Sequence, residues 1–391
     1  MKHYQYLIIG GGLAGDAAVR GIRELDTDGS IGLVGMEVDP PYMRPNLSKG
    51  LWKGRPMEKV WRNTQSLGAE ISLGRKITHF DPKKKSARDD QGEEYSFEKL
   101  LMATGGSPIH LPFGGSDIIY FRDLQDYHRL RALADKKESF LVIGGGFIGS
   151  EIAAALTMVG KKVTMVFLED AIGANIYPKD LANYLNEYYR GKGVDVVPAD
   201  SVTSMEKKGE RFSLRTKSGG AFEVDGVVGG LGIRPNVELA REAGLKIENG
   251  IVVNDKLETS APEIYAAGDV AMFHHSALAK MIRVEHEDNA IRMGRLAGRN
   301  MGGADEAYTH VPMFYSDLFE LGYEAVGELS SRLEVVSDWQ EPFKKGVVYY
   351  LEGSRVHGVL LWNVWDKVDA ARALMMEAGP FQAKDLPGKI K

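Results

Sequence analysis

The sequence predicts an α/β fold in which two similar strand-turn-helix units are joined to a smaller α+β domain. In residues 6–22, YLIIGGGLAGDAAVRGI, an apolar strand pattern runs into glycines and then into an alanine-rich helix. Residues 140–156, FLVIGGGFIGSEIAAAL, repeat this order. In residues 346–363, two apolar strand patterns flank Gly353 and Ser354, which indicates an antiparallel hairpin, and a helical pattern follows at 366–378.

Both strand-turn-helix units carry the spacing G-x-G-x-x-G. The glycines are Gly10, Gly12 and Gly15 in the first unit and Gly144, Gly146 and Gly149 in the second. The first glycine of this motif permits a sharp turn, the second lets the backbone approach a pyrophosphate, and the third allows the helix to pack close to the strand. The helix N-terminus then holds the anion. Repetition of the motif after 134 residues predicts two Rossmann-like dinucleotide-binding domains.

An acidic residue follows the next predicted strand in each unit. Glu37 ends the stretch IGLVGME, and Glu169 ends KVTMVFLE. Acids at this position bind the ribose hydroxyls of a dinucleotide, and a carboxylate there repels the 2′-phosphate of NADP. We therefore expect NADH to be preferred over NADPH. The alternative is that both are solvated loop carboxylates, and Glu169 is the weaker candidate because its strand is expected to end near Phe167.

Composition excludes several kinds of chemistry. The 391 residues are 43% hydrophobic, carry a formal net charge of −5 and include no cysteine. The charge gives no general attraction to nucleic acid or to an anionic membrane. Without cysteine, the chain has no disulfide, no thiolate metal site and no catalytic thiol. Glycine is enriched, at 46 residues or about 12% against a usual level of about 7%.

Nothing in the sequence predicts secretion or a membrane span. The N-terminal MKHYQYLIIGGG enters a strand pattern at once and lacks the features of a secretory signal, so a cytoplasmic location is the expectation. Residues 140–160 are apolar enough to be considered as a span, but they contain five glycines and Glu151. We interpret them as a buried strand, turn and helix.

Three further stretches qualify as candidate sites. In EIYAAGDVA, Asp269 follows a glycine at a strand end, where it can bind a ligand hydroxyl or cap a helix. The helix predicted over 283–298 begins near Glu285, and its N-terminal amides can stabilise negative charge. The loop PPYMRPNLSKG, residues 40–50, is stiffened by three prolines and predicts a helix from about Leu47. His274 and His275 have no matching ligand set, so no metal site is expected.

These motifs together resemble a known superfamily. The two glycine motifs, LLMATGGSP (100–108), VVGGLGIRPN (227–236) and IYAAGDVA (264–271) resemble flavoprotein reductases that have one FAD domain and one NAD(P)H domain. The loop at 40–50 is similar to that of ferredoxin reductases and apoptosis-inducing factor. RVEHEDNA (283–290), MFYSDLFELGYEAVG (313–327) and residues 346–372 resemble the apoptosis-inducing-factor branch more closely. Tyr315 departs from the family, which usually has Trp there against the flavin.

The resemblance implies a set of cofactor-binding residues. For FAD these are Gly10, Gly12, Leu13, Ala14, Gly15, Glu37, Arg44, Lys49, Ile77, Ala103, Thr104, Gly105, Asp269, Glu285, His286, Ala290 and Tyr315. For NAD they are Gly144, Gly146, Phe147, Ile148, Gly149, Glu151, Glu169 and Gly232. Lys49, Glu151 and Phe147 are implied as the catalytic group, since in this family the matching lysine and glutamate pair beside the reactive edge of the flavin. From the residues alone, Lys49 reads as a surface lysine and Phe147 as a core side chain.

The implied organisation has three domains. Residues 1–112 and 245–312 form a split FAD domain, residues 113–244 an NAD domain, and residues 313–391 a C-terminal α+β domain with an antiparallel sheet. The resemblance also implies that hydride passes from NADH to the flavin. Because no cysteine is present, the chain is not a disulfide reductase, and the flavin delivers electrons directly to ferredoxin, rubredoxin, a quinone or similar small acceptor, or oxygen.

Two functions remain open from the sequence. The first is an NADH-dependent FAD oxidoreductase of the ferredoxin-reductase type, with an iron-sulfur carrier or small molecule as acceptor. The second is a redox-responsive protein like apoptosis-inducing factor, which turns over slowly, forms a charge-transfer complex and acts through dimerisation or partner binding. Similarity in the C-terminal region favours the second, and the lack of that factor's long insertion weakens it. The protein is expected to be a monomer or a homodimer.

Overall fold

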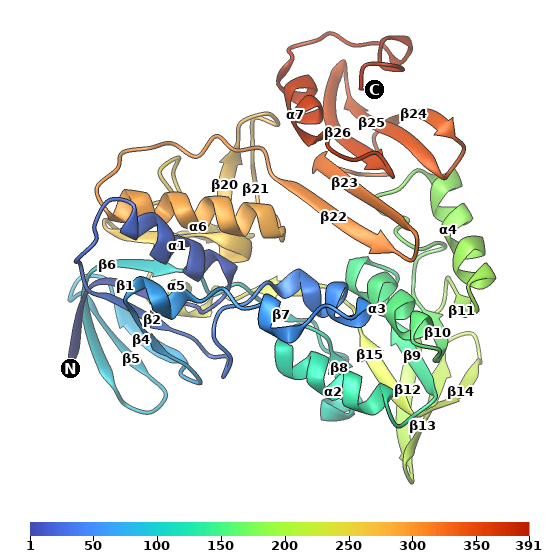
Figure 1. Ribbon diagram of the computed structural model, residues 1–391, viewed down its shortest axis with the longest axis horizontal. Coiled ribbons are helices and arrows are strands. Elements are labelled where there is room, and N and C mark those ends of the chain that lie inside the picture. Colours follow the sequence, from blue (N-terminus) through green and yellow to red (C-terminus); the bar gives the residue numbers. More distant parts are fainter. Residues whose placement is uncertain (391) are drawn as a thin grey trace. The chain divides into compact units, whose positions relative to one another are not determined.

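The computed structural model of the protein describes residues 1–390 (Figure 1). The chain divides into two compact units. The first unit consists of Met1–Pro45, Pro56–Ser107 and Arg234–Pro312. The second consists of Asn46–Arg55, Pro108–Ile233 and the chain from Met313 onward. The proline-rich loop of residues 40–50 therefore contributes to both units.

The first unit is built on a mainly parallel sheet with strand order β3-β2-β1-β6-β5-β4, and β19 pairs with β6. The strands of this sheet are β1 (Lys2–Ile9), β2 (Ile31–Val34), β3 (Ala69–Ser72), β4 (Ile77–Asp81), β5 (Ser86–Asp89), β6 (Glu94–Met102) and β19 (Ile264–Ala266). Antiparallel β4 and β5 form a hairpin around the lysine-rich turn at residues 82–85. Apolar runs in β1 and β6 are buried because the sheet is covered on both faces.

Smaller elements complete the first unit. They are η1 (Arg44–Leu47), η3 (Met57–Lys59), η4 (Thr64–Leu67), β7 (Gly106–Pro108), β16 (Ile233–Pro235), α5 (Glu238–Glu242), β17 (Ile247–Glu248), β18 (Gly250–Val252), η6 (Gly268–Val270), β20 (Ala271–His275) and β21 (Lys280–Ile282). Of these, η1, β7 and β16 lie at points where the chain passes from one unit to the other.

Two helices of the first unit pack at unusually close range, α1 (Leu13–Arg23) and α6 (Glu287–Met301), which lie side by side in Figure 1. A Cβ atom at Gly294 would lie 2.2 Å from the Ala14 carbonyl oxygen, and one at Gly298 would lie 2.1 Å from that of Ala18. Only glycine leaves room for such an approach. The close packing of the two helices therefore depends on Gly294 and Gly298, which the sequence interpretation did not single out.

The second unit repeats the glycine-turn architecture in a parallel sheet of order β11-β10-β9-β15-β8. Its elements before the C-terminal region are η2 (Gly50–Lys53), η5 (Gly115–Asp117), β8 (Ile118–Tyr120), α2 (Leu124–Ala134), β9 (Ser139–Ile143), α3 (Phe147–Met158), β10 (Lys162–Val166), α4 (Lys179–Gly191), β11 (Val194–Val197), β12 (Val202–Lys208), β13 (Arg211–Thr216), β14 (Ala221–Val224) and β15 (Gly226–Gly229). The apolar segment 140–160 is a buried strand, turn and helix, as the sequence predicts. No helix within residues 1–390 is long and apolar enough to cross a membrane.

The C-terminal part of the second unit is an antiparallel sheet of order β22-β23-β26-β25-β24. Its elements are β22 (Met313–Leu318), β23 (Leu321–Gly327), β24 (Glu334–Glu341), β25 (Lys345–Glu352), β26 (Arg355–Trp362), α7 (Val368–Met376) and η7 (Ala383–Asp385). The predicted hairpin around Gly353 and Ser354 is confirmed by the pairing of β25 with β26. Tyr188 of α4 donates a hydrogen bond to Glu320, and Tyr350 of β25 donates to the Ile176 carbonyl oxygen, so the antiparallel sheet is tied to the parallel one.

Two expected helix starts differ from the structure. No α-helix begins near Leu47. The chain forms the 3-10 turn η2 instead, and the left-handed Gly54 ends it after one turn. The helix expected from Glu285 begins at Glu287, with His286 as its N-cap residue in an extended conformation. Glu285 therefore precedes the helix.

Candidate cofactor and active-site residues

The first glycine turn follows β1, and its three glycines have different environments. Gly10 has φ +123°, and a Cβ atom there would lie 2.1 Å from the Ala103 carbonyl oxygen. At Gly15 a Cβ would lie 2.1 Å from the Gly10 carbonyl oxygen. Gly12 caps α1 in an extended conformation, and a Cβ there would meet nothing within 4 Å. The fold requires glycine at positions 10 and 15, whereas Gly12 leaves a bare backbone at a helix N-terminus, a cradle that suits a pyrophosphate.

The second glycine turn, after β9, has the same steric pattern. Gly144 has φ +112° and a Cβ there would lie 2.3 Å from the Gly230 carbonyl oxygen, while one at Gly149 would lie 2.0 Å from that of Gly144. Gly146, the N-cap of α3, again has nothing within 4 Å of its Cβ direction. Two units with this arrangement fit two dinucleotides, each with its pyrophosphate at a helix N-terminus.

The two acidic residues occupy matching positions in the two sheets. Ile9 is paired with Val34, the last residue of β2, and Ile143 with Val166, the last residue of β10. Glu37 and Glu169 each follow three residues later. Glu169, which looked the weaker candidate from sequence, is therefore placed as Glu37 is.

Glu37 is held by the proline-rich loop. Its Oε2 accepts a hydrogen bond from the Tyr42 hydroxyl at 2.6 Å, and its Oε1 pairs with the Arg44 guanidinium at 2.5 Å. Although burial opposes the charged guanidinium, the nearby Tyr42, Glu37 and Asp269 raise the pKa of Arg44. Arg44 therefore stays charged. The remaining lone pairs of the Glu37 carboxylate can accept ribose hydroxyls.

Most of the other expected FAD residues lie just past the carboxyl ends of the first unit's strands or in the helices that follow, whereas Ile77 is the first residue of a strand. Leu13 and Ala14 begin α1, Ala103, Thr104 and Gly105 follow β6, and Ile77 begins β4. Asp269 lies in η6, where a Cβ at the neighbouring Gly268 would be 3.0 Å from Ala14 and 3.8 Å from Ala290. Thus η6, α1 and α6 converge.

Residues before α6 add charge and a buried imidazole. The Arg283 guanidinium donates to the Asp269 carbonyl oxygen at 3.0 Å and to the Glu285 carboxylate at 2.8 Å. Burial lowers the pKa of His286 to about 4, so its ring is neutral at physiological pH. A neutral ring adds no charge at this helix start, where the α6 amides lie beside the charged side chains of Arg283 and Glu285.

The expected NAD residues surround the N-terminus of α3 and the ends of β10 and β15. Phe147 is 41% exposed, so it is not a core side chain, and its ring contacts that of Phe314 edge-on at 5.7 Å. Ile148 is also exposed. The Asn175 amide donates to Glu169 at 3.3 Å. Gly232, after β15, has φ +82°, which glycine adopts without strain.

Lys49 and Glu151 form an ion pair in the second unit. The Lys49 ammonium lies 2.7 Å from Glu151 Oε2, and the two side chains are 13% and 3% exposed. The same ammonium lies 5.2 Å from the centre of the Tyr315 ring, within cation-π range. The pairing expected from the resemblance is present, and Lys49 is not a free surface lysine.

Sequence interpretation missed two hydroxyl groups at this pair. Ser48 Oγ donates to Glu151 Oε2, and Ser316 Oγ donates to Oε1, both at 2.6 Å. The only sequence signal is adjacency, because Ser48 precedes Lys49 and Ser316 follows Tyr315. Serine next to a candidate residue is too common to be diagnostic.

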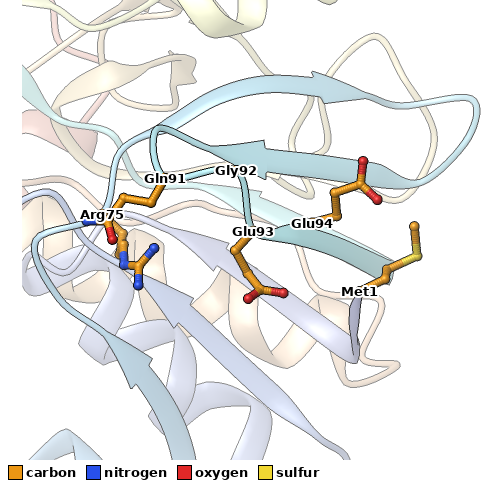
Figure 2. A pocket seen from close by; sticks show the side chains of 6 residues that line it. All are labelled: Met1, Arg75, Gln91, Gly92, Glu93 and Glu94. Atoms are coloured by element: carbon orange, nitrogen blue, oxygen red, sulfur yellow. The ribbon is translucent and has the colours of Figure 1, made fainter.

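Two other features do not form a cofactor site. His274 is exposed on β20, while the neighbouring His275 is buried and accepts a hydrogen bond from the Leu278 amide. Figure 2 shows a hollow of about 450 Å³ at the edge of the first unit, lined by Met1, Arg75, Gln91, Gly92, Glu93 and Glu94. Met1 precedes β1, whereas the glycine turn follows its other end, so this hollow is separate from the pyrophosphate cradle.

Comparison with known proteins places these features in context. Residues 4–294 match the pyridine nucleotide-disulphide oxidoreductase family, and residues 297–341 and 336–377 match the C-terminal region of mitochondrion-associated apoptosis-inducing factor. A putative apoptosis-inducing factor 1 from Drosophila melanogaster is 31% identical over 96% of this chain, which spans 63% of that relative. Rubredoxin-NAD(+) reductase from Pseudomonas putida is 31% identical over 83% of this chain and 86% of its own length.

Solved structures support the same fold. The covalent complex of putidaredoxin reductase with putidaredoxin matches with a TM-score of 0.92 and 27% identity, over 99% of this chain and 96% of the matched one. The match confirms the fold class expected from the sequence, with parallel sheets and a C-terminal antiparallel sheet.

Proposed function

Because the chain belongs to the pyridine nucleotide-disulphide oxidoreductase family, we propose that it is an NADH-dependent reductase containing FAD that passes electrons to an iron-sulfur protein or a small acceptor such as a quinone. The observation that carries this proposal is the pair of bare glycine cradles, Gly12 and Gly146, each followed by an acidic residue past the next strand. A single cradle would fit many nucleotide-binding proteins. Two such cradles in one chain suit NADH as the electron donor and FAD as the bound cofactor.

In this proposal the first unit binds FAD. The amides at the start of α1 bind the pyrophosphate, Glu37 binds the adenosine ribose, and Arg44 lies along the cofactor. Asp269 accepts hydrogen bonds from ribityl hydroxyls, and the N-terminus of α6 stabilises negative charge on the flavin. When bound, FAD would supply the ability to accept a hydride and then to release electrons one or two at a time.

The second unit binds NADH. The amides at the start of α3 bind its pyrophosphate, Glu169 binds the adenosine ribose, and Phe147 and the Lys49–Glu151 pair orient the nicotinamide. Preference for NADH over NADPH rests on Glu169, whose carboxylate would repel a 2′-phosphate. The domain organisation that we propose is an FAD domain of residues 1–112 and 245–312, an NAD domain of 113–244 and a C-terminal domain from 313.

The acceptor is proposed from chemistry and from relatives. The name of the family refers to disulfide chemistry, but a chain with no cysteine cannot pass electrons through a thiol pair. Electrons must therefore leave the flavin directly. The reductase in complex with putidaredoxin and the relative that reduces rubredoxin favour a small iron-sulfur or rubredoxin-type carrier. A cytoplasmic location remains a prediction.

A second candidate is a redox-responsive protein similar to apoptosis-inducing factor. The C-terminal match over 297–341 and 336–377 and the 31% identity to the fly relative favour it. In this alternative NADH reduces the flavin slowly, and the reduced protein changes its association with a second copy or a partner.

Anaerobic NADH titration of the FAD-loaded protein, followed by an acceptor panel and sizing before and after reduction, tests both candidates. Rapid reduction, turnover with ferredoxin or rubredoxin and unchanged size support the reductase. Slow reduction with a change in size supports the second candidate. A protein that binds no FAD after reconstitution would refute both.

A further inference from the structure

We propose that Ser316 is a positioning residue for NADH-dependent reduction, acting through Glu151 and assisted by Ser48. This inference rests on the proposed function. The carboxylate of Glu151 accepts three hydrogen bonds: Ser48 Oγ and Lys49 Nζ donate to Oε2 at 2.6 and 2.7 Å, and Ser316 Oγ donates to Oε1 at 2.6 Å. Within residues 1–390, Ser316 is thus the one hydrogen-bond donor recorded for Oε1.

Ser316 controls how the carboxylate is turned. The terminal torsion of a glutamate side chain has a broad energy minimum, so two donors on Oε2 alone do not define the carboxylate plane. A donor on Oε1 does. The side chain of Glu151 is 3% exposed, so bulk water cannot readily replace a lost donor.

A single strand holds both members of the ion pair. Successive side chains of a strand point to opposite faces, so neighbouring Tyr315 and Ser316 of β22 project on opposite sides of the sheet. Ser316 bonds Glu151, and the Tyr315 ring lies 5.2 Å from the Lys49 ammonium. Because β22 is an edge strand of its sheet, side chains on both faces of the strand can reach the ion pair.

Among the described residues, Lys49 is the charged side chain that pairs with Glu151. Three buried tyrosines act on it electrostatically: Tyr177, Tyr189 of α4 and Tyr323 of β23. Burial raises the pKa of each hydroxyl, so all three are neutral at physiological pH. Tyr189 donates a hydrogen bond to the Ser150 carbonyl oxygen, and the Tyr323 hydroxyl interacts with Tyr177 and Ser316. Neither replaces Ser316 at Oε1.

Loss of the Ser316 hydroxyl should therefore disturb geometry rather than NADH binding. The NADH contacts proposed for α3 and Glu169 are untouched by this change. We expect Ser316→Ala to lower the limiting rate of flavin reduction by about 10-fold, because a small misplacement of a reacting group costs rate steeply. The dissociation constant of NADH, taken from the concentration dependence of the same reaction, should change less than about 3-fold.

The test is stopped-flow reduction of the FAD-loaded protein by NADH with five variants, the first of which is Ser316→Ala. Ser316→Thr keeps the hydroxyl and should restore a rate near that of the parent protein. Ser337→Ala removes an exposed serine from β24 of the same sheet and should have no effect. Ser316→Ala combined with Glu151→Gln should be no slower than Glu151→Gln alone, because the hydroxyl acts through the carboxylate.

A second readout does not involve the flavin. In flavin-free protein, the effects of Ser316→Ala and Glu151→Gln on the urea midpoint should be non-additive, as expected for directly bonded side chains. An unchanged reduction rate in Ser316→Ala, failure of Ser316→Thr to rescue it, or additive effects in either double-mutant comparison would overturn the inference. If NADH does not reduce the parent protein at all, the proposed function fails and this inference fails with it.

Discussion

The ammonium of Lys49 lies 2.7 Å from the carboxylate of Glu151, a residue 102 positions further along the chain. Lys49 is part of a proline-rich loop, and Glu151 lies in the first turn and a half of α3, two residues after Gly149, the last glycine of the second glycine turn. A buried carboxylate with a single charged partner is costly to disturb, because removal of the partner leaves its charge uncompensated. The pair therefore links the loop to α3, the helix that follows the second glycine turn.

Lys49→Ala should slow reduction of the flavin by NADH by a factor on the order of 10 to 100, the scale of one charge-assisted contact of about 1.5 to 3 kcal/mol. Stopped-flow absorbance of the FAD-loaded protein measures this rate. Lys53→Ala is the matched control from the same segment. Its ion pair with Asp317 is 2.9 Å long but 43% and 36% exposed, so its loss should have little effect. Equal rates in Lys49→Ala and the parent protein would remove Lys49 from the active site.

Gly12→Ala should leave the fold intact and weaken FAD binding. The backbone of Gly12, at φ −84° and ψ −167°, suits alanine, and the new methyl group would meet no protein atom within 4 Å. It would project into the pyrophosphate cradle, at an expected cost of about 1 to 3 kcal/mol of binding, or roughly 5- to 150-fold in affinity. FAD titration of the flavin-free variant measures the change.

Gly15→Ala provides the contrast to Gly12→Ala. Its Cβ would lie 2.1 Å from the Gly10 carbonyl oxygen, so the turn must shift, and we expect a loss of at least about 1 to 3 kcal/mol in unfolding free energy. Urea unfolding of the two variants, both without FAD, tests the assignment. Equal stability of Gly12→Ala and Gly15→Ala would contradict it.

Gly146→Ala should impair NADH use while the protein retains FAD. Gly146 has φ −84° and ψ −165°, nearly the backbone of Gly12, and an equally open Cβ direction. We expect a rise of about 10-fold in the KM for NADH with a full complement of FAD, measured by steady-state kinetics and flavin absorbance. Loss of FAD from this variant would show that the two cradles are assigned in the wrong order.

Glu169→Ala should reduce the preference for NADH over NADPH by about 10-fold, since one unfavourable charge contact with a 2′-phosphate is removed. The measured quantity is the ratio of kcat/KM for the two coenzymes. Asp170→Ala, at an exposed carboxylate one residue away, is the control and should leave the ratio unchanged. A parent protein that uses both coenzymes equally would refute the role of Glu169 at the ribose.

His275 should make the protein less stable in acid. Burial lowers the pKa of His275 to about 4, from the ordinary value of 6.5 that applies in the unfolded chain. Between these values the unfolded state binds the proton and the folded state does not. Stability is therefore fully present above pH 6.5 and falls as the pH drops towards 4, by about 3 kcal/mol in total.

His275→Asn tests this pH dependence, because an amide oxygen can still accept the bond from the Leu278 amide. Unfolding free energies from urea titrations at pH 4 to 7 should have a slope smaller by up to one proton in the variant. His286, whose pKa burial also lowers to about 4, should leave a residual slope of the same sign. Exposed His274→Asn is the control, and an identical slope in His275→Asn and the parent protein would contradict the prediction.

Local spacing predicted the two glycine turns and the elements around them. Gly10, Gly12 and Gly15 are close in sequence, so the turn that they form depends on covalent neighbours, and the same holds for the second motif. The strand before each turn, the helix after it and the acid past the next strand were predicted for the same reason. The prediction of a helix from about Leu47 was wrong, because Gly54 in a left-handed conformation ends the 3-10 turn η2 after Lys53.

The sequence by itself therefore determined the two glycine turns, the C-terminal hairpin, the family resemblance and the absence of thiol chemistry. Tertiary structure decided which glycines have an open Cβ direction, since the atoms that crowd Gly10 and Gly144 belong to Ala103 and Gly230, which directly follow β6 and β15. It also decided that Ser316, 165 residues from Glu151, completes the hydrogen bonds of that carboxylate. Contacts at such separations arise only when sheets and helices pack, because no local spacing rule encodes which side chains then meet.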